Sequence, residues 1–121
     1  MDRTVKIKYL KLLGIVLTGF AFGHYQYRIF TKYNFLTGQI DKLNNKYQII
    51  VYGETSSDDM FLNIAARDFK FQYEFIGCNI STPALHGIDG YNSVMKNQLT
   101  KINGKDWEEK FMLEVEKLKA Q

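Results

Sequence analysis

Cysteine, proline and histidine are scarce in this chain, and each shortage narrows the class of protein. Of the 121 residues, one is cysteine (Cys78), one is proline (Pro83) and two are histidine. A lone cysteine cannot form a disulfide within the chain. No CxxC or HxxxH spacing occurs, and His86 is the only histidine after residue 24, so soft ligands for zinc are too few. We therefore predict no metal site.

Two other absences concern cofactors and disorder. Gly87 and Gly90 lack the spacing of a phosphate-binding loop, and no lysine is followed by serine or threonine. The chain has no internal repeat and no low-complexity tract, which argues against a disordered tail. We therefore expect one small domain that uses no cofactor.

Charge is distributed unevenly along the chain. Residues 1–33 carry six Lys or Arg and one acidic residue (net +5), and residues 34–121 carry ten and twelve (net −2), which together give the formal +3. Binding to nucleic acid requires a basic face that neutralises phosphates. Because the larger part of the chain is mildly acidic, we predict that it does not bind nucleic acid.

The basic segment has the pattern of a bacterial export signal or membrane anchor. Arg3, Lys6, Lys8 and Lys11 precede an apolar stretch, and basic residues of this kind stay on the cytoplasmic side. The predicted anchor residues are Leu12, Leu13, Ile15, Val16, Leu17, Phe20 and Phe22.

The length of this segment leaves more than one interpretation open. No charge occurs from Leu12 to Tyr27, and snorkelling of Lys11 and Arg28 extends the predicted lipid contact to residues 9–29. This predicts a transmembrane signal-anchor in the bacterial inner membrane, with residues 36–121 as a periplasmic domain. The alternatives are cleavage after Gly23, which leaves a soluble periplasmic protein, and a soluble protein whose first helix is buried. Five aromatic residues follow the apolar stretch, as an interfacial belt or a partner-binding surface: Tyr25, Tyr27, Phe30, Tyr33 and Phe35.

Residues 36–121 predict a small α/β domain in the order β-α-β-α-α, with two or three strands. Residues 47–52 and 71–76 are rich in β-branched and aromatic residues, and each run ends at a glycine. A helix between them, capped by Ser56 or Ser57, makes a parallel βαβ unit. We expect residues 37–39 to be the seam between leader and domain. The apolar face expected for this helix is Met60, Phe61, Ile64 and Ala65.

Two further helices are expected after the second strand. Residues 86–90 have the composition of a loop, so the first of these helices should begin near Tyr91 and end at Gly104. Its apolar stripe is Tyr91, Val94, Met95, Leu99 and Ile102. Asp106 and Glu109 are spaced as a capping box for the last helix, which should bury Trp107, Phe111, Met112, Val115 and Leu118.

These motifs, in this order, resemble the FEKKY-domain family of small bacterial exported proteins and lipoproteins of uncharacterised function. The residues that carry the likeness are Tyr52-Gly53, Phe69 to Tyr73, Gly77-Cys78, Tyr91-Asn92 and Asn103 to Trp107. The resemblance covers residues 46–118 and implies a fold and a compartment but no catalytic residues. The family usually has glycine in place of Lys70, and many members have a lipobox cysteine that this chain lacks.

Cys78 is the residue with the most chemistry, and two interpretations of it are open. It follows a strand end, and His86 and Asp89 would complete a nucleophilic triad. The alternative is a buried structural cysteine, which behaves as a small apolar side chain. The sequence favours the structural one.

The sequence therefore predicts a membrane-anchored binding or accessory module, possessing a protein partner in the bacterial envelope. Trp107 and the five aromatic residues are its candidate partner contacts. The alternative function is an exported periplasmic enzyme that uses Cys78 with His86.

Overall fold

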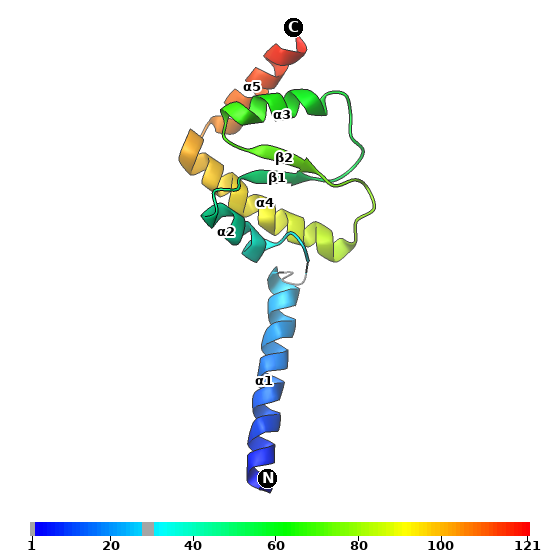
Figure 1. Cartoon of the computed structure of the whole chain (residues 1–121), viewed down its shortest axis with the longest axis vertical. Coiled ribbons are helices and arrows are strands. Elements are labelled where there is room, and N and C mark those ends of the chain that lie inside the picture. Colours follow the sequence, from blue (N-terminus) through cyan, green and yellow to red (C-terminus); the bar gives the residue numbers. More distant parts are fainter. Residues whose placement is uncertain (1, 28–30) are drawn as a thin grey trace.

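The computed structural model describes residues 2–27 and 31–121, which form five helices and a two-stranded sheet (Figure 1). In chain order they are α1 (Arg3–Tyr27), α2 (Phe35–Leu43), β1 (Gln48–Val51), α3 (Asp59–Asp68), β2 (Gln72–Phe75), α4 (Thr82–Asn103) and α5 (Trp107–Lys119). The predicted order β-α-β-α-α is confirmed for the domain, and helix predominates over strand.

The sheet consists of β1 and β2, which run parallel with Gln48 opposite Gln72 and Val51 opposite Phe75. α3 is the crossover helix between them, as the sequence predicts. Side chains from two helices close the outer edges of the sheet. Asn92 of α4 accepts a hydrogen bond from the Ile50 N–H (2.8 Å) and donates one to the Ile50 carbonyl (2.9 Å). Asn63 of α3 accepts a hydrogen bond from the Tyr73 N–H at 2.9 Å, so the edges are protected from pairing with another chain.

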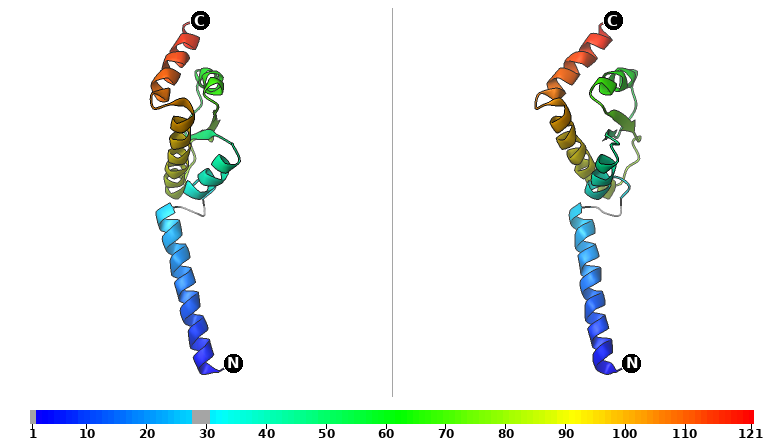
Figure 2. Two further views of the ribbon diagram at one scale, coloured as in Figure 1. Left: turned by 90° about the vertical axis from the view of Figure 1, so that its left-hand side faces the viewer. Right: turned by 60° about the vertical axis from the view of Figure 1, so that its left-hand side comes forward.

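α4 and α5 lie along one side of the domain, and α2, the strands and α3 lie along the other (Figure 2). α2 packs directly on α4, and α3 packs on α5. The core lies where α4 and α5 meet the sheet. Edge-to-face ring pairs join Phe71 to Trp107 and Phe69 to Phe111. The buried apolar residues of this cluster are Ile49, Ile50, Ala65, Ala66, Phe71, Ile88, Tyr91, Met95, Leu99, Trp107, Phe111 and Val115.

The start of the domain differs from the prediction. The expected seam at residues 37–39 lies inside α2, which begins at Phe35 because Asn34 and Thr37 form a reciprocal capping box. Asn34 is buried, and Gly38 packs against α4 at Tyr91 and Val94. Residues 31–35, which the prediction placed in the leader, therefore pack as part of the domain.

The predicted loop at residues 86–90 is wrong, because α4 starts at Thr82 with Ser81 as its N-cap. Gly87 is buried, and a Cβ atom there would overlap the carbonyl oxygen of Tyr33. Gly87 and Gly90, which suggest a loop, instead allow residues 31–35 to approach the helix closely. The predicted stripe of Tyr91, Val94, Met95 and Leu99 is buried, and the helix ends at Gly104 as expected.

Several predicted helix details are also wrong. Asp106 makes no side-chain cap bond and instead pairs with Lys110 at 3.0 Å, so the predicted capping box does not form. Met112 is 50% exposed, because α5 turns Trp107, Phe111 and Val115 towards the core. On α3 the N-cap is Asp58, and the buried residues are Ala65 and Ala66. Met60 and Ile64 of the predicted face are exposed.

α1 extends away from the rest of the molecule in Figures 1 and 2. Within the described residues, no helix combines the length and apolar character needed to cross a membrane. The transmembrane signal-anchor and the inner-membrane location predicted from the sequence are therefore wrong. The apolar run from Leu12 to Phe22 has eleven residues. Such a helix is about 16 Å long, whereas the hydrocarbon core is about 30 Å thick. Lys11 and His24 lie just outside the run.

Candidate functional site

An open groove of about 570 Å³ lies where the two strands begin, beside α3 and the turn that follows α2. Its floor is β2, whose Gln72 and Glu74 side chains are exposed, and its walls come from α3 and the turn between α2 and β1. We call this the β2 groove; it is lined by Asn45, Lys46, Tyr47, Asn63, Arg67 and residues 70–74.

Two turns of the same kind shape the β2 groove. After α2, the Lys46 N–H donates to the Asp41 carbonyl (2.9 Å) and the Asn45 N–H to the Lys42 carbonyl (3.1 Å). This pair of bonds is a Schellman motif, which ends a helix with one residue in the left-handed conformation. That residue is Asn45, with φ of 57°.

α3 ends in the same way. The Phe71 N–H donates to the Ala66 carbonyl and the Lys70 N–H to the Arg67 carbonyl, each at 3.1 Å. Here the left-handed residue is Lys70, with φ of 66°. Asparagine tolerates this conformation, whereas lysine is strained in it and glycine is the usual occupant. Within the described residues, Asn45 and Lys70 are the non-glycine residues with positive φ, and both line the groove.

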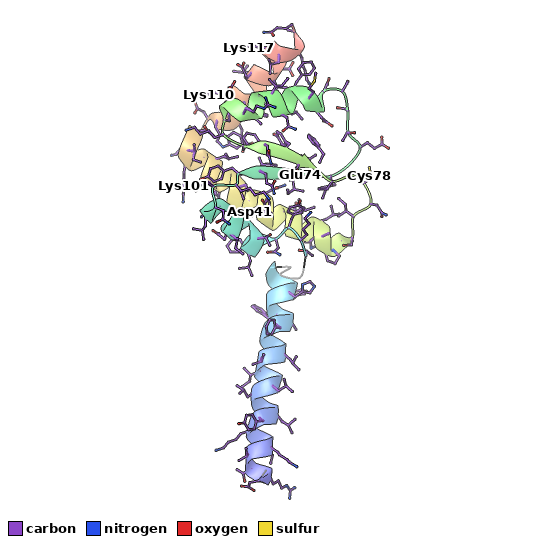
Figure 3. The ribbon with its side chains drawn as sticks, in the orientation of Figure 1. Asp41, Glu74, Cys78, Lys101, Lys110 and Lys117 are labelled. Carbon is purple, nitrogen blue, oxygen red and sulfur yellow. The ribbon has the colours of Figure 1, made fainter. Side chains whose placement is uncertain are left out.

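The charge around the β2 groove differs from that of the domain. Lys46, Arg67 and Lys70 are exposed at the groove, with Glu74 as the carboxylate in its lining. Among the described residues, none of these three cations has an ion-pair partner, whereas Lys110, Lys117 and Lys119 all do. Figure 3 shows Glu74 on β2 and Lys101 away from it at the end of α4. The groove is thus a local basic site on an acidic domain.

A polar network centred on Tyr91 links α2, α4 and β1. The Tyr91 hydroxyl donates to the Asp41 carboxylate at 2.5 Å and accepts from the Gln48 side-chain amide at 2.9 Å. Burial and the bond to Asp41 raise the pKa of Tyr91 above its usual range. Gln48 is also buried, and each side chain of the network provides a hydrogen-bond partner for another. The network therefore fixes where α2 and its turn lie.

Cys78 is exposed in the segment between β2 and α4 (Figure 3). The prediction of a buried structural cysteine is wrong, because the chain leaves the sheet after Phe75 and Gly77 has φ of 82°. His86 and Asp89 are exposed on α4. The three side chains do not form a water-excluding site, and the catalytic alternative stays a prediction.

The carboxyl ends of the strands carry a second hollow, of about 580 Å³, where sites often lie in parallel sheets. Its lining includes Ile76, Asn79, Ile80 and Ile88 but not Cys78. Lys32 is its one cation among the described residues, and this ammonium lies 5.1 Å from the Tyr33 ring centre. Within the described part of the chain, no three His, Cys, Asp or Glu side chains gather to hold a metal ion.

The predicted partner-binding aromatic residues lie in different environments. Trp107 is 2% exposed and donates to the Thr100 hydroxyl at 3.0 Å, so its prediction as an exposed anchor is wrong. Tyr33 packs edge-to-face on Tyr91 at 5.3 Å. Phe35 is 38% and Tyr25 72% exposed. Phe30 and the side chain of Tyr27 lie outside the described residues.

Sequence reasoning missed the β2 groove because its cations come from two separate segments, the turn after α2 and the end of α3. Lys46 and Arg67 belong to no motif, and the expectation for parallel sheets directs attention to the opposite ends of the strands. One signal was present: Lys70 stands where the FEKKY-domain family usually has glycine. The structure keeps a glycine-type conformation at that position.

Comparison with known proteins gives no relative. No family model matches this chain, and neither does any curated protein or solved structure.

Proposed function

We propose that this protein is a small accessory module that binds another protein through α1. The observation that carries the proposal is the exposure of this 25-residue helix. Every large apolar side chain from Val5 to Tyr25 is at least one-third exposed, from 36% for Val5 to 72% for Tyr25. A contiguous apolar surface of this kind marks an interaction site.

The packing of the other elements supports an external partner. The extensively packed pairs among the described elements are α2 with α4, β1 with β2, α3 with α5, α4 with β1, α3 with β2 and α4 with α5. α1 belongs to none of them. An unsupported helix gains most of its stability from whatever packs on its apolar side. A groove on a protein partner is a common receptor for such a helix.

Charge narrows the chemistry of this partner. The first part of α1 carries Arg3, Lys6, Lys8 and Lys11, and the helix contains no acidic residue. A second copy of α1 offers no opposite charge to these four cations. We therefore expect a different protein, with an apolar groove that has acidic residues at one end.

In this proposal, the rest of the chain is a folded domain that α1 attaches to the partner. We propose that it is related to the FEKKY-domain family, and the order of its helices and strands supports this relationship. The family's exported location and the contact of residues 9–29 with lipid stay predictions. No observation favours the nucleophilic role of Cys78 as a second function.

Site-specific photo-cross-linking in the producing cells tests the proposal. A cross-linker replaces Leu13 or Leu17 on α1 in the full chain, and Met112 on α5 serves as an equally exposed control. We expect Leu13 and Leu17 to give an adduct with the same protein and Met112 to give none. Charge reversal with Lys6→Glu and Lys8→Glu should reduce the yield of that adduct.

Three outcomes would contradict this function: no adduct from α1, adducts with lipid alone, or adducts with a second copy alone. An identical adduct from Met112 would also contradict it, because the contact would then not be specific to α1.

A further inference from the structure

We infer that the β2 groove binds an acidic polypeptide segment in extended conformation. This site is separate from α1, so the inference goes beyond the proposed function and does not rest on it. Lys46, Arg67 and Lys70 supply the positive charge, and β2 supplies the floor.

Among the described residues, the three cations of the β2 groove form no ion pair with the acidic residues of the domain. They come from the two helix-ending turns and the last turn of α3, and within the described residues none pairs with a carboxylate. Residues 34–121 carry a net charge of −2, yet three of their ten Lys and Arg side chains line this one groove. Opposite charge on a ligand would supply the missing partners.

The backbone at Lys70 provides a second argument. Glycine would occupy this left-handed position with less strain, and lysine introduces strain there without any ion pair in return. Strained backbone of this kind clusters at functional sites. We therefore assign the Lys70 side chain to ligand binding.

The lining favours a peptide over a phosphate or a nucleic acid. The Glu74 carboxylate on the floor can accept an N–H from a peptide, and a phosphate group has no N–H to donate. Gln72, also exposed, offers both a donor and an acceptor. The cations come from separate segments that border an open groove, an arrangement that suits several carboxylates along an extended chain.

Binding of synthetic peptides to the full chain tests this inference. The probe is a short fluorescent peptide of alternating glutamate and serine, and the control probe alternates lysine and serine. We expect binding of the acidic peptide that weakens as salt rises. In NMR spectra, amide shifts should be confined to residues 45–47 and 67–74.

Variants then distinguish binding in the β2 groove from attraction by positive charge elsewhere on the protein. Lys70→Gly should bind the acidic peptide about threefold more weakly, while its melting temperature rises by about 4 °C. Arg67→Glu should weaken binding about tenfold. Lys101→Gln, which removes an exposed cation outside the groove, should change nothing. The double change Lys6→Gln and Lys8→Gln, in the basic end of α1, should change nothing either.

Because Lys70→Gly is expected to fold more stably, its loss of affinity would not come from unfolding. The inference is overturned if the acidic peptide does not bind, or if Lys101→Gln weakens binding as much as Lys70→Gly. Tighter binding of a single-stranded oligonucleotide or inorganic phosphate would also overturn it.

Discussion

Tyrosine hydroxyls inside the domain link its stability to alkaline pH. Burial, with a smaller effect from the Glu108 carboxylate, raises the pKa of Tyr73 from 10.0 to about 12. The folded protein therefore favours the neutral phenol. The contribution of Tyr73 to folding stability is complete below pH 10, where its phenol is neutral in the unfolded chain as well. This contribution is lost as the pH rises towards 12.

Replacement of Tyr73 by phenylalanine should remove this dependence. Between pH 10 and 12, the wild type should lose roughly 1–2 kcal/mol more unfolding free energy than Tyr73→Phe. Urea denaturation of both proteins across this range measures the difference. Stability curves that remain parallel would show that Tyr73 ionises as freely in the folded protein as in the unfolded chain.

At the residue scale, the sequence predicts which side chains are buried better than it predicts which are exposed. Tyr91 and Leu99 are buried as their helical spacing indicates. Cys78 and Met112 are exposed although both are apolar, because periodicity does not reveal where a strand ends or how a helix is rotated. The left-handed backbone of Lys70 has no signal in this sequence beyond the family comparison.

Among the secondary-structure elements, α4 does most to hold the sheet in place. A two-stranded sheet is marginal alone, and α4 closes the edge of β1 with the Asn92 amide. Ile50 is 2% exposed, so without Asn92 its N–H and carbonyl would lie buried with no partner.

Asn92→Ala should therefore destabilise the fold by about 2 kcal/mol. Asn97→Ala, an exposed change on the same helix, is the matched control and should alter the unfolding free energy by less than about 0.5 kcal/mol. Equilibrium urea unfolding measures both. Equal losses would mean that the Asn92 bonds to Ile50 add nothing beyond helix propensity.

Most elements of the domain follow from the sequence, and the exceptions have identifiable causes. The two strands and their parallel pairing follow from β-branched runs around a helix. The first turns of α4 do not, because Gly87 and Gly90 read locally as a loop. Their role comes from tertiary contact with residues 31–35, which local pattern does not contain.

Over the residues that the structure describes, the whole molecule consists of a compact domain and one helix, α1, that belongs to none of the extensively packed pairs. The sequence identifies α1 as the distinctive segment through its basic and apolar residues, but it overestimates the length of the apolar run. The β2 groove combines the turn after α2, one side of α3 and residues 70–74, so only the folded chain reveals it.

Hydrogen exchange along α1 tests the central claim most directly. In the isolated chain, amides from Leu10 to Leu17 should exchange much faster than those from Tyr91 to Leu99, because little packing supports them. In the complex isolated through the cross-linked partner, the same amides should become protected, while those of α4 stay unchanged. Protection of α1 as strong as that of α4 in the isolated chain, or no gain in the complex, would contradict the account.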